Sequence, residues 1–358
     1  MQKIKYFQKD SCFEIKNSTF VSQFSNINFN IKQKNTMEKP YVVGIDIGAQ
    51  TAKLGLVDAR GNIMSSSVIV SNDTTDENVF ICNLCNAIIK LLPEGITLDK
   101  VRGIGIGAPN GNFHKGSIER APNLTWGGME KLIPFADLVT ACINLPVKIT
   151  NDANAAALGE MYYGAAKGIN DFIMITLGTG VGSGIVVGGK LLYGHDGFAG
   201  ELGHTCSVRN NGRLCGCGRT GCLESYASAI GVARTAREFL QSQPQKPSLL
   251  RDISPQDITS KDVYETAVQG DELAKEVFEF TGKILGEALS DFVAFSAPEA
   301  IILFGGLVKS GDLIMKPVKE HLERNLLRIW QGKVKVLPSV LKESDAAILG
   351  ASALAWEI

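Results

Sequence analysis

Two segments of this chain, about 130 residues apart, repeat one pattern of a short apolar strand, a glycine-rich turn and a returning strand. The first segment is GIDIGAQTAKLGLVDARGNI, from residue 44, and the second is FIMITLGTGVGSGIVVGGKLLYG, from residue 172. They match in shape more than in sequence. A repeated unit of this kind predicts a duplicated fold with two similar lobes. Because strands and helices alternate along the rest of the chain, we expect an α/β fold.

The elements beyond the two repeated units fit this class. Apolar runs bounded by turn residues predict strands, and apolar residues at helical spacing predict helices. A loop dense in Gly, Pro and Asn covers residues 108–126. Further strands are expected at 66–70, 101–108, 145–150, 300–306 and 333–338, and helices at 76–92, 151–164, 227–240, 261–269, 271–295, 312–326 and 345–356.

Composition excludes several classes of protein. The chain has 358 residues, which is room for two domains, and its 45% apolar and 20% charged residues are close to globular averages. A net charge of -1 provides no basic field for nucleic acid. Eight cysteines in a chain of this length do not indicate a secreted disulfide scaffold, and no apolar run is long enough to span a bilayer. We therefore expect a cytoplasmic protein with no nucleic-acid or membrane partner.

The N-terminal stretch differs from the rest. Residues 1–36 are rich in Lys, Asn, Gln, Ser and Phe, contain no glycine and show no clear period. They also lack the apolar region of a signal peptide. Regular structure is expected to begin abruptly in MEKPYVVGIDIG, which opens at Met37. We interpret residues 1–36 as a poorly ordered extension, with Met37 as an alternative natural start.

A short cluster of metal-binding residues stands between residues 204 and 222. His204 precedes Cys215, Cys217 and Cys222 in the run HTCSVRNNGRLCGCGRTGC. One imidazole and three thiolates can complete a tetrahedral zinc shell with no open position, which indicates a structural site. Glycines between the cysteines allow the tight turns that such a shell needs. The alternative is a set of reduced, unpaired cysteines near a surface loop.

The two glycine turns are also candidate phosphate cradles. Glycine lets several backbone N–H groups approach one anion closely. Gly305 and Gly306, which follow the apolar run AIILF, could lie under a nucleotide base. Each turn alone is also typical of an ordinary hairpin, and none matches a P-loop or a dinucleotide fingerprint. Two such turns in duplicated lobes favour ATP held between the lobes.

Together these motifs resemble the ROK family of sugar kinases and related repressors, most closely its glucose-type members. The resemblance covers about residues 41–356. It rests on DIG in the first turn, LGTGVGSG in the second, GHDGFAGELGH at 194–204 and CGCGRTGCLE at 215–224. It implies two ribonuclease-H-like lobes of the actin and hexokinase type with a cleft between them. The expected lobes are 37–148 and 149–344, the second with the zinc loop, and a final helix at 345–358 that returns to the first.

The resemblance also implies roles for individual residues. Asp152, in ITNDANAAALG, matches the catalytic aspartate, and a carboxylate there can accept the proton of a sugar hydroxyl. Its alternative role is a helix N-cap. The residues that match sugar-binding positions are Asn151, Glu201, His204 and Glu224. His204 would then hold zinc with one ring nitrogen and face the sugar with the other.

Further matches fall on the phosphate loops. Asp46 matches the acidic residue that reaches the magnesium–phosphate region. The family's first loop usually reads Asp-x-Gly-Gly-Thr, whereas this chain has Gly48-Ala49-Gln50 and then Thr51. The sequence therefore leaves open whether Gln50 or Thr51 contacts phosphate. In the second loop, Thr179 and Gly180 match phosphate-binding positions.

The loop APNGNFHKGSIERAPNLTW bears on the identity of the sugar. Asn110 lies where family members contact sugar, and Asn123 belongs to an Asn-Leu-x-Trp run of glucose-type members. An Asn amide can donate to and accept from neighbouring hydroxyls, although each Asn could instead form an Asx-turn. We expect phosphorylation of the 6-hydroxyl of glucose by ATP and Mg²⁺, with an N-acetylhexosamine such as N-acetylglucosamine or N-acetylmannosamine as the alternative substrate.

Two other classes of protein are disfavoured. ROK repressors carry a helix-turn-helix domain before the sugar-binding part, whereas about 40 residues with no helical period or basic helix precede the first expected strand here. This disfavours a repressor, and the intact Asp152 position disfavours a catalytically inactive sugar-binding protein. Since family members form dimers, a homodimer or higher homo-oligomer is expected.

Overall fold

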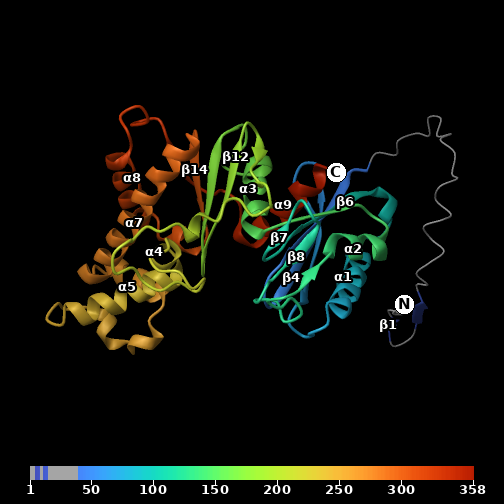
Figure 1. Cartoon of the computed structure of the whole chain (residues 1–358), viewed down its shortest axis with the longest axis horizontal. Helices are drawn as coiled ribbons and strands as arrows, with labels where there is room; N and C mark the ends of the chain where they lie inside the picture. The colour runs from blue at the N-terminus through green and yellow to red at the C-terminus, as the bar shows by residue number, and fades with distance from the viewer. Residues whose placement is uncertain (1–4, 9–10, 15–38) are drawn as a thin grey trace.

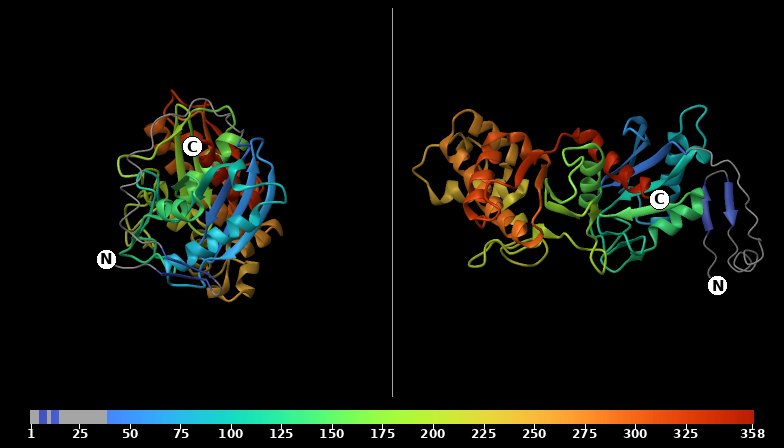
Figure 2. Two further views of the ribbon diagram at one scale, coloured as in Figure 1. Left: turned by 90° about the vertical axis from the view of Figure 1, so that its right-hand side faces the viewer. Right: turned by 90° about the horizontal axis from the view of Figure 1, so that it is seen from above.

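Two five-stranded sheets with helices packed on them form the body of the protein (Figure 1). This computed structural model describes residues 5–8, 11–14 and 39–358. The two sheets are separated along the long axis of the molecule, and the right-hand view of Figure 2 shows the same separation from above. The α/β class predicted from the sequence is confirmed by this architecture.

The first sheet has the strand order β10-β6-β3-β4-β5. β3 and β4 form an antiparallel hairpin, and β5 pairs antiparallel to β4. β6 runs parallel to β3, and β10 runs parallel to β6. The bounds are β3 Tyr41–Ile47, β4 Thr51–Asp58, β5 Ile63–Val70, β6 Val101–Gly107 and β10 Val147–Thr150.

Helices α1 and α2 cover the first sheet, and their apolar faces supply its core. α1 (Glu77–Leu91) agrees with the predicted helix, whereas α2 (Phe135–Ile143) was not predicted. Stacked aromatic rings join the two helices, since Phe80 lies 4.7 Å from Trp126 and 6.3 Å from Phe135 between ring centroids. All three side chains are fully buried. A small sheet of β7 (Gly111–Asn112), β8 (Ser117–Glu119) and β9 (Leu132–Ile133) crosses the region predicted as a loop.

The second sheet repeats the topology of the first. Its strand order is β13-β12-β11-β14-β15. β12 pairs antiparallel with both β11 and β13. β14 runs parallel to β11, and β15 runs parallel to β14. Strand by strand this matches β5-β4-β3-β6-β10, so the duplication predicted from the two glycine-turn units is confirmed. The bounds are β11 Phe172–Leu177, β12 Val181–Val187, β13 Lys190–Leu191, β14 Ala300–Phe304 and β15 Lys335–Pro338.

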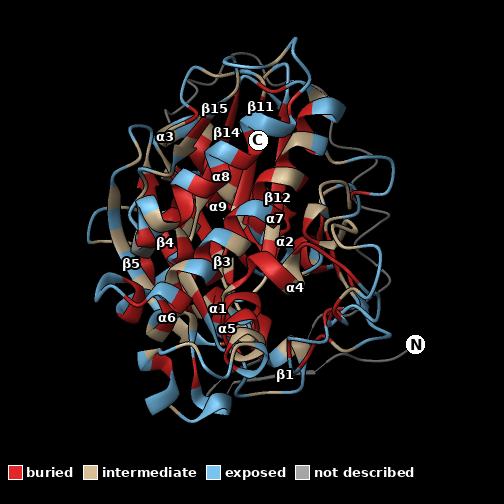
Figure 3. Ribbon diagram, turned by 90° about the vertical axis from the view of Figure 1, so that its left-hand side faces the viewer, coloured by how far each residue is buried: buried red, intermediate tan, exposed pale blue. Residues whose placement is uncertain are grey.

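A larger helical layer covers the second sheet. α7 and α8 pack most closely, because glycines in α7 let the backbones approach: a Cβ at Gly282 would lie 2.7 Å from Pro317. Figure 3 shows the buried strands inside and the exposed faces on the outer helices. The α-helices are α4 Glu224–Ala227, α5 Ala229–Ser242, α6 Ser260–Val268, α7 Glu272–Ser296 and α8 Asp312–Asn325. The 3-10 helices are η2 Leu98–Lys100, η3 Leu202–His204, η4 Leu249–Asp252, η5 Pro255–Asp257 and η6 Gly306–Ser310.

Helices α3 (Asp152–Tyr163) and α9 (Glu343–Trp356) lie between the two sheets (Figure 1). α9 packs on the first sheet at glycines of β3 and β6. A Cβ at Gly44 would lie 2.2 Å from Ile348 O, and one at Gly105 would lie 1.9 Å from Ala351 O. Only glycine permits this approach of a helix backbone to a strand. The C-terminal helix is therefore tied to strands that precede it by about 240 to 300 residues.

The N-terminal prediction is only partly within the described residues. β1 (Lys5–Gln8) pairs antiparallel with β2 (Ser11–Glu14). The rest of residues 1–36 lies outside the described residues, so the expected extension stays a prediction, as do the lobe boundaries at 37–148 and 149–344. Among the helices of the described ranges, none is long and apolar enough to cross a membrane.

Candidate functional site

Asp152 is the first residue of α3, at the point where β10 ends. The helix cap is Asn151, whose Oδ1 accepts a hydrogen bond from Asn154 N at 2.7 Å. The alternative role of Asp152 as the N-cap is therefore wrong. Its Oδ1 accepts a bond from the N–H of the next residue, Ala153, at 2.9 Å, and the residue is exposed. Because Asn151 performs the capping, the carboxylate of Asp152 remains accessible for chemistry.

Asp46, near the end of β3, lies beside Asp152. Asp46 pairs in register with Gly107 of β6, and a Cβ at Gly107 would lie 3.9 Å from Asp46 Oδ1 and 3.6 Å from Asp152 Cα. Glycine at this position therefore allows the start of α3 to approach Asp46. Burial raises the pKa of Asp46 to about 6, the charge of Asp152 adds to the rise, and the charge of Lys53 opposes it.

Asp152 is exposed, yet the surrounding protein raises the pKa of its carboxyl group. Desolvation by the surrounding protein raises the pKa of Asp152, and hydrogen bonds from backbone N–H groups partly oppose the rise. The residue is nevertheless open to solvent. An accessible carboxylate whose surroundings disfavour its charge is suited to accept a proton.

The first glycine turn lies at the end of β3. Gly48 N donates to Thr51 O at 2.9 Å, and Ser71 holds the turn by donating from Oγ to Gly48 O at 2.7 Å. Ser71 N also donates to Gln50 O at 2.9 Å. Gln50 and Thr51 are both exposed at the tip, so the side chains of both are accessible to a ligand.

The second glycine turn is held by Glu224. Val181 N donates to Glu224 Oε2 at 3.0 Å, and a Cβ at Gly180 would lie 2.5 Å from the same oxygen. Thr179 is exposed at the tip. Gly305, with φ +111°, packs beneath the turn, where a Cβ would lie 2.5 Å from Leu177 O. The structure thus brings Gly305 to the second turn, and the role of Gly305 and Gly306 under a nucleotide base stays a prediction.

Glu201 and His204 lie close to the carboxylates of Asp152 and Glu224. Burial raises the pKa of Glu201, His204 lowers it, and the charges of Asp152 and Glu224 raise it further. Four predicted residues from three segments of the chain thus share one electrostatic environment: Asp152 from α3, Glu201 and His204 from the η3 region, and Glu224 from α4.

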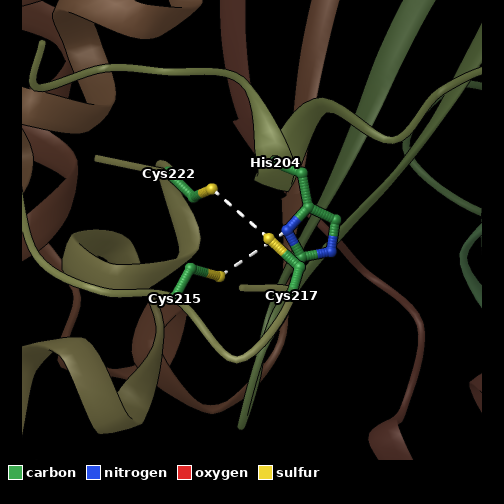
Figure 4. Close-up of side chains that lie close together, drawn as sticks. All are labelled: His204, Cys215, Cys217 and Cys222. Atoms are coloured by element: carbon green, nitrogen blue, oxygen red, sulfur yellow. Dashed lines mark hydrogen bonds between the residues drawn. The ribbon is translucent and has the colours of Figure 1, made fainter. Parts of the chain in front are cut away.

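The four predicted zinc ligands form one cluster (Figure 4). Their ligand atoms all lie within 4.8 Å of one another. Cys215 Sγ is 3.7 Å from His204 Nδ1, and Cys217 Sγ is 3.7 Å from Cys222 Sγ. A tetrahedral zinc with bonds of about 2.3 Å to sulfur separates its sulfur ligands by about 3.8 Å. The cluster therefore has the size of a zinc shell, and its sulfurs are too far apart for disulfides.

The zinc cluster contacts the candidate sugar residues directly. Glu224 Oε1 accepts a bond from Cys215 Sγ at 3.5 Å, while Oε2 holds the second turn. His204 contributes Nδ1 to the cluster, and its Nε2 has no hydrogen-bond partner within the described part of the chain. A metal in this cluster would fix both side chains.

The predicted asparagines are less closely gathered. Asn110 adopts a left-handed conformation, φ 52°, and its Nδ2 donates to Arg120 O at 2.8 Å. This contact leaves its Oδ1 for a ligand. Asn123 is exposed in the turn after β8. Asn151 is buried, and its Oδ1 is committed to the cap of α3.

Two residues at this site were missed by the sequence analysis. Lys53 of β4 is the register partner of Asp46. Asn112, fully buried beside Asn110, donates to Asp196 O at 2.7 Å and so links the two lobes. Lys53 could have been found, since the hairpin pairs it with Asp46. Asn112 gave no signal, because its partner is 84 residues away.

Comparison with known proteins shows which family the chain matches. Residues 42–358 match the ROK family. The glucokinase of Halalkalibacterium halodurans is 35% identical over 317 residues, which cover 88% of this chain and 94% of that protein. The xylose repressor of Caldicellulosiruptor bescii is 28% identical over 318 residues, which cover 87% of this chain and 77% of that protein.

Solved structures give the same result. A ROK family glucokinase from Streptomyces griseus, solved in complex with glucose and AMPPNP, has a TM-score of 0.72 and 35% sequence identity. The match covers 89% of this chain and 100% of that one. The resemblance drawn from the motifs is thereby confirmed, together with the actin/hexokinase-like fold. This chain belongs to the ROK family.

Proposed function

We propose that this protein is an ATP-dependent kinase that transfers a phosphoryl group to the 6-hydroxyl of glucose. The observation that carries the proposal is the exposed Asp152, which lies beside Asp46 and close to Glu201. A hexokinase-type phosphotransferase is also what the glucokinase relatives, at 35% identity over most of the chain, support.

Asp152 is the proposed general base. A sugar hydroxyl is a poor nucleophile, and a carboxylate within hydrogen-bond reach accepts its proton as the phosphoryl group arrives. Asp152 lies at the first position of α3, where the helix dipole favours its ionised form before proton transfer. The raised pKa then favours protonation once the hydroxyl reacts. These two influences suit a group that must alternate between both states.

The two glycine turns are the proposed phosphate contacts. Gln50 and Thr51 in the first turn and Thr179 in the second are exposed, and Gly180 beside Thr179 is half-buried; together they offer backbone and side-chain donors. Gly48 forms the bend of the first turn. Mg²⁺ would neutralise phosphate oxygens near Asp46, since magnesium prefers carboxylate and phosphate ligands.

The nucleotide base has a candidate cavity beside Gly305. A cavity of about 230 Å³ lies between the end of β14 and the segment before α9, and Gly305 forms part of its wall. Its lining is mostly apolar, as a purine ring requires. The lining residues are Leu303, Phe304, Gly305, Val308, Lys309, Pro338, Ser339 and Leu341. We place the adenine there, with Gly306 beside it.

The sugar would lie against Glu201, His204 and Glu224. Carboxylates accept hydrogen bonds from sugar hydroxyls, and the His204 Nε2 faces away from the cysteine cluster. Zinc fits that cluster and, bound to His204 Nδ1, would fix the orientation of the imidazole ring. Asn110, Asn123 and Asn151 are the further proposed sugar contacts, through Oδ1 at Asn110 and the amide nitrogen at Asn151.

The experiment that tests this proposal is an ADP-release assay with ATP and Mg²⁺ over five sugars: glucose, mannose, fructose, N-acetylglucosamine and N-acetylmannosamine. We expect the highest kcat/KM with glucose, and glucose 6-phosphate as the product by NMR. A preference of tenfold or more for an N-acetylhexosamine would refute glucose as the substrate. Sugar binding without turnover on any of them would refute the kinase and favour a sensor like the repressor relatives.

The proposed assembly and division of the chain need separate measurements. A homodimer or higher homo-oligomer, as expected from the family resemblance, is testable by light scattering. The proposed lobes are 37–148 with the C-terminal helix, and 149–344.

A further inference from the structure

A contact between the lobes lies next to the proposed sugar site. The turn between β7 and β8 meets the loop that follows β13. Asn112 Nδ2 donates to Asp196 O at 2.7 Å, and His114 Nε2 lies 2.8 Å from Gly194 O. We call this contact, between residues 112–114 and residues 193–197, the clasp.

Asn112 is the centre of the clasp. Its side chain is fully buried, and its Oδ1 accepts bonds from His114 N at 3.0 Å and Lys115 N at 3.2 Å. Across the lobe boundary Gly197, with φ +90°, approaches so closely that a Cβ would lie 2.6 Å from Asn112 Oδ1. Every polar atom of the amide group thus has a protein partner. The buried amide and the glycine fix the distance between the two loops.

An aromatic stack reinforces the clasp. Phe113 and Tyr193 lie 3.9 Å apart between ring centroids with an interplanar angle of 5°. Lys148 Nζ lies 5.5 Å from the centroid of Phe113. The hydroxyl of Tyr193 is buried and has no hydrogen-bond partner among the described residues. The contact therefore uses the face of the tyrosine ring, and phenylalanine could replace it.

The clasp is close in sequence to residues of both lobes that we expect to contact the sugar. Asn110 precedes Asn112 by two residues in the first lobe, and Glu201 follows Asp196 by five in the second. Asn110 is itself held by its bond to Arg120 O. A shift of either loop at the clasp would change the separation of Asn110 and Glu201.

We infer that the clasp sets the spacing of the two sugar-contacting loops, with Asn112 and the Phe113–Tyr193 stack as positioning residues. This inference rests on the proposed function, because it takes the sugar to lie between the loops. The phosphate turns are held separately, by Ser71 and Glu224. Loss of the clasp should therefore weaken sugar binding while ATP binding is retained.

The test uses Asn112→Ala, Phe113→Leu and Tyr193→Leu in the full chain, with Tyr193→Phe as the conservative variant. Misplacement of binding groups by about 1 Å can cost up to about 10²-fold. We expect the glucose KM, and the glucose Kd by calorimetry without ATP, to rise about 10-fold or more. The KM for ATP should change less than about twofold. Tyr193→Phe should restore both glucose constants toward those of the wild type.

The outcomes separate this inference from the proposed function. If the wild-type protein phosphorylates glucose and the folded Phe113→Leu and Tyr193→Leu variants keep the wild-type glucose KM and Kd, the clasp has no positioning role. A fall in melting temperature without a change in these constants would also overturn it, as a purely structural contact. A wild-type protein that phosphorylates none of the sugars would contradict the proposed function, while glucose Kd values would still test the clasp.

Discussion

The two glycine turns occupy the same place in two sheets of the same topology, but their surroundings differ in charge. In the first sheet Asp46 is paired in register with Lys53. In the second sheet the equivalent pair is Thr176 and Gly182, and Thr176 Oγ1 accepts a bond from Gly182 N at 3.0 Å. The first turn is therefore flanked by opposite charges and the second by a neutral pair.

The turns also differ in length. Four residues, 48–51, separate the paired Ile47 and Ala52, whereas three residues, 178–180, separate Leu177 and Val181. The shorter turn is fastened to Glu224, and the longer one to Ser71. A duplicated backbone thus supports one turn with a charged strand pair, next to Asp152, and one turn with a neutral strand pair, which Glu224 holds next to the candidate base cavity. This difference favours the reacting end of ATP at the first turn.

The largest expected effect follows from Asp152→Asn. The change keeps the shape of the side chain and removes the base, so kcat should fall by about 10² to 10⁴. The melting temperature should stay near that of the wild type, because Asn151 supplies the cap of α3. Asp257→Asn, at an exposed aspartate of η5, is the matched control and should keep full activity. Near wild-type kcat in Asp152→Asn would mean that another group takes the proton.

The zinc loop has no equivalent in the described part of the first lobe. The Cys217→Ser variant tests how much the loop contributes to sugar binding. We expect about one zinc per chain in protein purified without added metal, by elemental analysis. Cys217→Ser should lose this metal and raise the sugar KM about 10- to 100-fold, because His204 and Glu224 lose their support. The KM for ATP should change less.

The control for this variant is Cys206→Ser. Cys206 lies in the same loop, but its Sγ is near Val208 O at 3.7 Å and outside the group of four ligand atoms. The Cys206→Ser variant should retain both the zinc and the affinity for sugar. Active wild-type protein without zinc would remove the basis for a metal-supported sugar site.

The charged pair of the first turn should be visible in the pH profile. Asp46 has a pKa of about 6, so we expect kcat/KM to rise with pH through about 6 as Asp46 ionises. The charge of Lys53 lowers this pKa, so Lys53→Met should shift the acid limb to higher pH. Lys190→Met, on β13, and Thr176→Val, in the neutral pair, should leave the limb in place. An unchanged limb in Lys53→Met would show that the two turns do not differ in the way proposed.

Stability should respond to Asp46 in the opposite direction. Its pKa in the folded protein lies above its ordinary value of 3.8, so the folded state binds the proton more tightly than the unfolded state. Its contribution to stability therefore falls as pH rises from about 4 to about 6. Asp46→Asn should then raise the melting temperature more at pH 7 than at pH 4.

The sequence predicted the parts of the fold that have a strong local signal. The long helix α7 was placed within one residue at each end, since its apolar period extends over 25 residues. α2 and the strands β7–β9 were missed because they span only nine, two, three and two residues, too few for a period. The β5 strand begins at Ile63, three residues before the start predicted at 66, because Ile63 was assigned to the end of the preceding strand–turn unit.

At the candidate site, too, the sequence predicted the features that have a strong local signal. The four zinc ligands lie within 19 residues, and the cluster was found from spacing alone. The capping role of Asn151 in place of Asp152 could not be decided, because both side chains can cap a helix. The clasp joins residues about 80 positions apart, and only the packing of the lobes brings them together.

The smallest effect is expected at the N-terminus. A chain that begins at Met37 keeps both five-stranded sheets, since β3 begins at Tyr41. Residues 1–36 show no pattern able to bury an apolar face, so their removal should leave the melting temperature and kcat/KM unchanged. Calorimetry and the ADP-release assay on both chains would measure this. A clear drop in either value would show that the first lobe depends on an N-terminal partner for which the second lobe has no equivalent.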